Sequence, residues 1–192
     1  LNDALASMFK ELTTHNNILF VLSPNLSYEE ILNLKNLASK LNANVSGYSP
    51  DTFDSSFGDD YLRNSDKAVN RASFKELGID ESEDYFNYSL NSSSLIIIFE
   101  NSYFENNINL LKDKKVISFF SHNCLTIGNS DISIPVTSFY EKSGTYINCD
   151  NIKQKVVSKM NKNNPMSTTT SIIENLKSMI EKGALWVLQS LL

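Results

Sequence analysis

Three short runs of residues constrain the fold of this chain most strongly, because they are apolar at nearly every position. They span residues 17–22, 94–99 and 115–120. A strand buried on both faces has this pattern, and such strands form the interior of parallel sheets. Runs of this length are far short of the roughly 20 residues that cross a bilayer as a helix. They therefore predict a buried sheet and no membrane span.

Helical periodicity separates these runs. Residues 3–14 and 28–41 carry apolar side chains at helical spacing. Ser27 and Glu30 have the spacing of a capping box, which predicts where the second helix begins. A short strand at residues 43–47 then completes a strand–helix–strand unit. This alternation predicts an α/β fold: a three-layer, mostly parallel Rossmann-like sheet with helices on both faces.

The remainder of the chain has weaker signals. Residues 50–92 lack a strong period and predict an excursion across the edge of the sheet, with a short helix at 71–77. A fourth strand is expected at 131–135 and a peripheral strand or hairpin at 148–157. Ser171 and Glu174 have capping-box spacing and predict a final helix that ends at Gly183. Its inward side chains would be Ile172, Ile173, Leu176, Met179 and Ile180.

Two units are predicted: an α/β domain at residues 1–160 and a C-terminal helical segment at 161–192 that packs on it. The start at Leu1 and the apolar stretch at 184–192 suggest a fragment of a longer subunit. The net charge is -5 and the lysines are scattered, so a nucleic-acid partner is not expected.

No familiar phosphate-binding or catalytic motif is present. The chain has six glycines, and none of them forms a G-x-G pair or a P-loop. The first strand runs into Ser23, Pro24 and Asn25, where proline removes one N–H from any anion-binding turn. Dinucleotide binding by the usual mechanism is therefore not expected, although the helix N-termini at Ser27 and Ser171 could hold an anion as any helix can.

The candidate nucleophiles and metal ligands are few. His122 and Cys124 are close in sequence, but Cys149 and His15 are distant, so we favour a polar loop end over a zinc site or a Cys-His pair. The acidic residues Asp59, Asp60, Glu81, Glu83 and Asp84 are interpreted as solvated loop charge. No metal site and no catalytic residue are predicted.

Two segments resemble a known family more specifically. Residues 130–135 (S-D-I-S-I-P) and 139–150 (F-Y-E-K-S-G-T-Y-I-N-C-D), followed by Gln154, are similar to a signature of the molybdopterin oxidoreductase superfamily. That signature reads A-D-V-V-L-P and then F-x-E-K-x-G-T-F-x-N-x-E-G-R-x-Q. Where it has E-G-R, this chain has Asp150, Asn151 and Ile152, which removes the glycine and the cation that would suit an anionic pterin dinucleotide.

Weaker matches point to one branch of this superfamily, the large iron-sulfur subunit of bacterial NADH-quinone oxidoreductase, respiratory complex I. Residues 60–63 (D-Y-L-R), 66–67 (D-K), 70–71 (N-R) and 77–78 (L-G) resemble its D-D-F-L…D-K…N-x-x-G stretch. Residues 28–30, 37–38 and 42–44 resemble the preceding helix and turn.

The resemblance implies a non-catalytic scaffold domain, in which Glu141, Gly144, Thr145 and Asn148 serve the fold. It implies no cofactor in this fragment, iron-sulfur clusters in the upstream part of the subunit, and other hydrophilic-arm subunits as partners. The implied location is cytoplasmic, peripheral to the inner membrane through the complex and without direct membrane insertion.

Two alternatives remain open. The first is a fragment of a cofactor-binding molybdopterin oxidoreductase of the formate-dehydrogenase type, in which Gly144, Thr145, Asn148 and Gln154 would line the molybdopterin groove. The second is an unrelated α/β binding domain.

Overall fold

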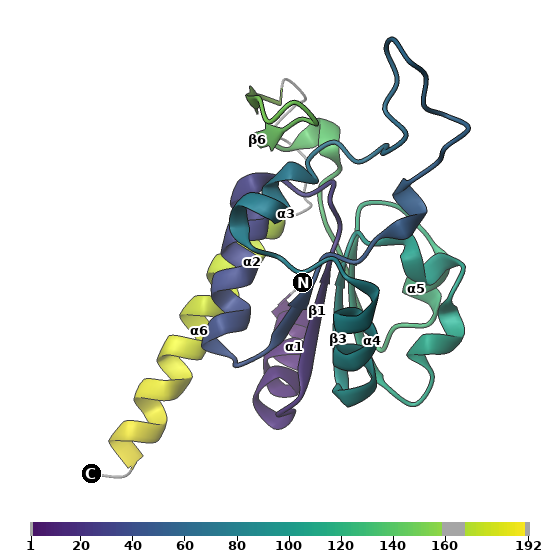
Figure 1. The fold of residues 1–192 in the computed structure, drawn as a ribbon. Coiled ribbons are helices and arrows are strands. Elements are labelled where there is room, and N and C mark those ends of the chain that lie inside the picture. Colours follow the sequence, from purple (N-terminus) through teal and green to yellow (C-terminus); the bar gives the residue numbers. More distant parts are fainter. Residues whose placement is uncertain (1, 159–167, 191–192) are drawn as a thin grey trace.

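The computed structural model describes residues 2–158 and 168–190, with side chains described for residues 3–158 and 168–182. Five parallel strands form its main sheet in the order β2-β1-β3-β4-β5 (Figure 1). They are β1 (Ile18–Leu22), β2 (Asn44–Ser46), β3 (Leu95–Phe99), β4 (Lys115–Phe120) and β5 (Ile132–Pro135). Every residue of β1 and β3 is buried, which explains why these runs are apolar throughout.

Helices cover both faces of the sheet, as predicted. One face packs against α1 (Asn2–Thr14), α2 (Tyr28–Lys40), α3 (Ala72–Leu77) and α6 (Thr169–Ser190). The other packs against α4 (Glu83–Ser92), α5 (Leu125–Gly128) and the 3₁₀ turns η2 (Ser102–Glu105) and η3 (Ile108–Leu111). Figure 1 shows α2 and α6 on one side of the strands and α4 and α5 on the other. The three-layer Rossmann-like architecture is confirmed.

The final helix differs from its prediction at both ends. It begins at Thr169, so Ser171 lies inside the helix, and the Ser171 amide donates to Thr168 Oγ1 (3.1 Å). The backbone stays helical through Gly183 to Ser190, so the predicted stop at Gly183 is wrong. Ile172, Ile173 and Leu176 are buried on the main core, and Met179 and Ile180 are half-buried. The predicted domain boundary at 160 lies outside the described residues.

A two-stranded antiparallel hairpin forms a separate small sheet, and only its second strand lies within the range 148–157 where the sequence predicts a peripheral strand or hairpin. Its strands are β6 (Gly144–Ile147) and β7 (Lys153–Val156), and the 3₁₀ turn η4 (Phe139–Glu141) precedes them. Figure 1 shows β6 beyond the carboxyl ends of the main strands, close to α2 and α3. None of the described helices is both long enough and apolar enough to cross a bilayer.

Candidate functional site

The carboxyl ends of β1 and β3 mark the position where this fold is expected to hold a ligand. After β1 the chain crosses to the α2 face, and after β3 it crosses to the opposite face, where η2 lies. Ligands of open α/β sheets bind in the crevice at such a reversal. The side chains at this edge therefore decide what the domain can do.

Asn101 closes the crevice from the side of β3. Its side chain is 1% exposed, and its amide nitrogen donates to the carbonyls of Leu22 (2.9 Å) and Tyr48 (3.1 Å). Its amide oxygen accepts the N–H of Tyr103 (3.1 Å), which lies at the start of η2. One side chain thus joins the ends of β1 and β2 to the turn after β3, and its hydrogen bonds are used within the protein.

A buried ion triad lies beside this asparagine. Lys142 Nζ is 3.0 Å from a Glu30 carboxylate oxygen and 3.3 Å from Glu100 Oε2. The side chains of Lys142 and Glu30 are 4% and 2% exposed, and that of Glu100 is 14% exposed. Glu100 follows β3 directly and has a left-handed backbone with φ of 48°. Such a conformation is uncommon outside glycine and asparagine, and it places this carboxylate where the strand ends.

The N-terminus of α2 is closed by its own residues. Ser27 Oγ accepts the amide of Glu30 (3.2 Å), and Glu30 Oε2 accepts the amide of Ser27 (2.8 Å), so the predicted capping box is confirmed. A helix N-terminus after the first strand is the usual phosphate position in this class of sheet. Here the Glu30 carboxylate takes the place of that anion, and Lys142 neutralises it.

The β6–β7 hairpin is fastened to the same helix end. Glu29 accepts both the amide (2.8 Å) and the hydroxyl (2.6 Å) of Thr145. A Cβ at Gly144 would lie 2.4 Å from Ser27 Cβ, so only glycine allows β6 to approach α2 this closely. The buried Asn70 accepts the Ile147 amide (2.6 Å) and donates to the Leu26 carbonyl (2.6 Å).

The charges at this edge are predominantly negative. Burial alone would raise the pKa of Glu29, but hydrogen bonds from Thr145 hold that pKa below its usual range. Burial raises the pKa of the Tyr146 phenol far above its usual range, and the carboxylates of Glu30, Glu100 and Glu29 add to the effect. Glu30 and Glu100 both contact the ammonium group of Lys142, and Glu29 lies next to Glu30 in the chain, so the local field disfavours a phosphate-bearing ligand.

The residues that the molybdopterin alternative assigns to a groove lie together in this hairpin. Gly144 and Thr145 form the contacts with α2 just described. Asn148 Oδ1 accepts the amides of Asp150 (3.0 Å) and Ile152 (2.9 Å) and so builds the turn between β6 and β7. Gln154 is exposed and pairs with Tyr146 across the hairpin. Glu141 caps η4 by accepting from Ser138.

A hollow of about 500 Å³ borders the triad on the hairpin side. It is lined by carboxylates and lysines together, among them Glu29, Glu141, Lys142 and Lys155. This mixture of carboxylates and lysines differs from the row of backbone amides that glycine-rich turns offer to a pyrophosphate.

The other candidate groups do not converge. His122 is exposed and meets the Phe120 ring edge-on at 5.8 Å. Burial raises the pKa of the Cys124 thiol, and the neighbouring Glu105 raises it further, which is the opposite of an activated nucleophile. Within residues 3–158 and 168–182, no cluster of three or more histidine, cysteine or acidic side chains could hold a metal ion.

The acidic residues interpreted as loop charge have separate structural roles. Glu81 forms an ion pair with Arg71, and Glu83 and Asp84 occupy the first turn of α4, where a negative charge suits the helix dipole. The excursion expected over residues 50–92 is therefore wrong at residues 83–92, which form α4. Asp59 and Asp60 lie at the tip of a long loop.

Glu100 and Asn101 are site residues that no sequence motif predicts, whereas Lys142 is the lysine of the F-x-E-K-x-G-T signature. A usable signal exists for the first two, since a polar pair directly after a fully apolar strand lies at the carboxyl edge of a parallel sheet. The signature does not show which group Lys142 contacts, because its partner Glu30 lies 112 residues away in the chain. Comparison of the chain with protein-family models and with curated protein sequences gave no match.

Proposed function

We propose that this chain is a non-catalytic scaffold domain of a protein similar to the large iron-sulfur subunit of NADH-quinone oxidoreductase. In this proposal electrons pass through iron-sulfur clusters carried upstream in the same polypeptide. Neighbouring hydrophilic-arm subunits of the complex are the partners, and the complex places the domain at the cytoplasmic side of the inner membrane.

One observation carries the non-catalytic part of the proposal. At the helix end where a related sheet would hold a phosphate, Glu30 and Lys142 form a buried pair at 3.0 Å. A ligand would have to displace a desolvated ion pair and the capping bonds of α2 together, and breaking such a buried pair is strongly unfavourable. This arrangement at the carboxyl edge of the sheet therefore favours a rigid structural role over a site that binds and releases a ligand.

The family part of the proposal depends on the resemblance of residues 130–154. In the structure these residues form β5, η4 and the β6–β7 hairpin, a continuous unit that reaches from the sheet to the end of α2. The glycine and threonine of the signature make the closest contacts to α2. A signature retained for such contacts is consistent with a scaffold that descends from a cofactor-binding ancestor.

The molybdopterin alternative fits the same residues less well. The Thr145 hydroxyl and Asn148 Oδ1 are hydrogen-bonded within the protein, and Ser27 occupies the space beside Gly144 where a side chain would lie. Three carboxylates near this edge also oppose an anionic pterin dinucleotide.

The test uses the full-length native polypeptide. Metal analysis should detect iron but no stoichiometric molybdenum or tungsten, and pterin fluorescence should be absent. Either metal at one equivalent, with a fluorescent pterin released on denaturation, would overturn the scaffold proposal. The coding sequence upstream of Leu1 provides an independent check, because the proposal requires cysteine-rich cluster-binding domains there.

A further inference from the structure

The most exposed apolar side chains of the described chain lie at the end of a long, ordered loop. Residues 53–66, here named the tip loop, project from the body of the molecule between η1 (Pro50–Thr52) and α3 (Figure 1). The loop is closed by main-chain hydrogen bonds from Asp54 to Ser65 (2.8 Å) and from Asp59 to Arg63 (2.9 Å). Residues Phe53 and Asp66 form an antiparallel bridge at its base.

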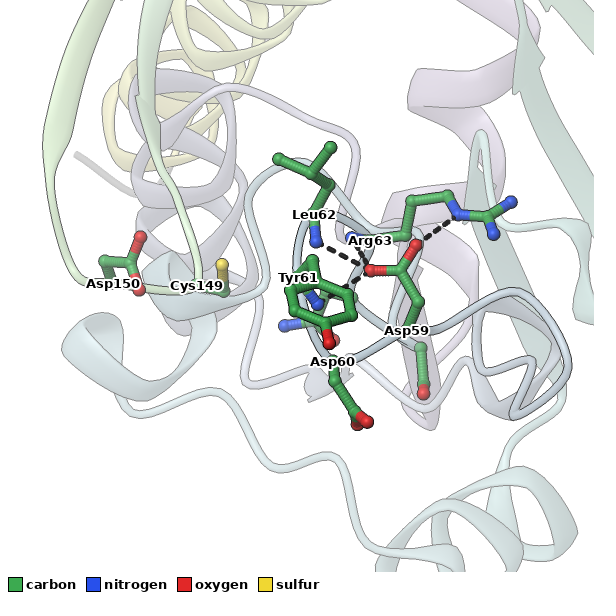
Figure 2. Close-up of a pocket in the computed structure, with 9 residues that line it drawn as sticks. Asp59, Asp60, Tyr61, Leu62, Arg63, Cys149 and Asp150 are labelled. Carbon is green, nitrogen blue, oxygen red and sulfur yellow. Dashed lines mark hydrogen bonds and ion pairs between the residues drawn. The ribbon is translucent and has the colours of Figure 1, made fainter.

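A single carboxylate holds the turn at the end of this loop. Asp59 Oδ1 accepts the backbone amides of Tyr61, Leu62 and Arg63 at 2.9, 2.6 and 3.0 Å. Figure 2 shows this carboxylate at the centre of the turn, with Arg63 folded back onto it. The amide of Leu62, and then the Arg63 side chain, lower the pKa of Asp59 well below its usual range, so the group stays ionised at neutral pH.

This turn presents two apolar side chains to solvent. Tyr61 is 91% exposed and Leu62 is 94% exposed. Two other aromatic rings of the loop each contact a cation, since the guanidinium of Arg63 lies 5.4 Å from the Phe57 ring and that of Arg71 lies 4.6 Å from the Phe53 ring. Single exposed apolar residues are common on proteins. Here the two apolar residues are adjacent, and hydrogen bonds within the turn already fix its backbone. Burying them against a partner would therefore cost little additional conformational entropy.

The surroundings of this pair are acidic. A hollow of about 470 Å³ separates the tip loop from Cys149 and Asp150 in the β6–β7 turn (Figure 2). Asp60 and Asp150 line it, are exposed, and form no ion pair with any described residue. The nearby cations Arg63 and Lys67 are paired with Asp59 and Asp54. The hollow therefore carries uncompensated negative charge beside an apolar projection.

We propose that this hollow and the tip loop form a docking site for another protein, whose surface presents a lysine or arginine beside an apolar recess. The cation lies between Asp60 and Asp150, and the recess covers Tyr61 and Leu62. Charge complementarity selects this occupant, because the chain itself has a net charge of -5 and an anionic membrane surface would repel the same carboxylates. The proposal rests on the scaffold function and extends it by naming the surface through which a neighbouring subunit attaches.

The first test uses a thiol that the site already contains. Cys149 is exposed in the wall of the hollow, whereas Cys124 is half-buried near Glu105 and serves as an internal reference. In the full-length polypeptide, alkylation of Cys149 by N-ethylmaleimide should be at least about tenfold slower in the assembled complex than in the free subunit. The rate at Cys124 should be the same in both. An equal rate at Cys149 in the two states would overturn the proposal.

The second test identifies what covers the tip. A photo-crosslinking phenylalanine derivative replaces Tyr61 in the full-length polypeptide, and the matched control replaces Tyr88, which is 71% exposed on α4. Crosslinking from position 61, and not from position 88, should join one other polypeptide through a segment that contains lysine or arginine. A crosslink to a second copy of the chain, to lipid, or to a segment without a cation contradicts the proposal.

Variants then test the chemistry in a binding assay between the purified full-length polypeptide and the purified partner protein. Leu62→Ala, and the charge reversals Asp60→Lys and Asp150→Lys together, should each weaken binding at least about tenfold. The same charge reversal at the exposed Asp84 of α4 should have little effect. Binding that does not respond to the paired reversal would overturn the site. A pterin found in the same preparation would instead overturn the scaffold function and leave the docking site standing, so the two failures are distinguishable.

Discussion

Replacing Lys142 by methionine removes the cation of the buried triad while keeping most of the side-chain volume. Glu30 and Glu100, 2% and 14% exposed, would then face each other without a counterion. Breaking a buried ion pair by removing one partner costs about 3–5 kcal/mol. The lower end applies here, because Glu30 keeps the Ser27 amide as a donor and Glu100 is partly solvated. We expect a loss of about 3 kcal/mol in the free energy of unfolding.

Equilibrium unfolding in urea measures this loss. With a slope of about 2 kcal/mol/M for a chain of this size, the midpoint should fall by about 1.5 M. Lys40→Met is the matched control, since Lys40 pairs with Glu181 at 2.9 Å on the surface, with exposed fractions of 49% and 62%. That control should change stability by less than about 1 kcal/mol.

A double variant separates the charge effect from packing. Adding Glu100→Gln to Lys142→Met removes one of the two orphaned carboxylates and should recover part of the lost stability. The reasoning is refuted if Lys142→Met shifts the midpoint no further than Lys40→Met does, because the pair would then contribute no more than a surface contact.

Three further predictions concern the hairpin, the tip loop and the thiols. Gly144→Ala should lower the free energy of unfolding in urea by about 1–3 kcal/mol, because the added methyl group collides with Ser27 at the start of α2. Gly128→Ala is the control, since a methyl group there meets no atom within 4 Å and should be neutral or stabilising. Equal effects of the two substitutions would contradict this prediction. The folded-state pKa of Asp59 is depressed, so its hold on the tip is complete above the unfolded pKa of about 3.9 and is lost only as pH falls through the lower folded value. The chemical shift of the Asp59 carboxyl carbon should therefore stay constant from pH 7 to about 4, and its titration near the unfolded pKa would refute the hydrogen-bonded turn. Iodoacetamide at pH 8 should modify Cys149 before Cys124, because burial raises the pKa of the Cys124 thiol. In the unfolded protein the two cysteines should react at the same rate. Faster reaction of Cys124 than of Cys149 in the folded protein would contradict the burial of Cys124.

The β6–β7 hairpin shows how far a sequence pattern reaches. The resemblance to the molybdopterin oxidoreductase signature singles out Gly144 and Thr145, and in the structure both contact α2, with no room for a Cβ at Gly144. The same pattern does not show which of two functions the pair serves. The function depends on whether α2 or a cofactor faces Gly144 and Thr145. A local sequence pattern does not show this, because α2 is distant from the hairpin in the chain.

The two helix errors have a local physical cause. The pattern of α4 is too weak to predict a helix, because only Phe86 and Leu90 among its ten residues are large and buried. The end of α6 is predicted at Gly183 because glycine commonly ends helices, yet glycine within a helix is destabilising by only about 1 kcal/mol. Neighbouring residues can outweigh so small a preference.

By itself the sequence determined the parallel sheet, the capped start of α2 and the layers of helix on both faces. These features follow from side-chain patterns that act within a few residues, where burial on both faces of a strand or a capping bond can be inferred directly. Only the tertiary structure brought Lys142 to Glu30 and Glu100, set Asn101 across the ends of two strands, and placed Asp150 opposite the tip loop. Those contacts join residues that are far apart in the chain. Their energies depend on burial and on interatomic distance, and a local sequence pattern gives neither quantity.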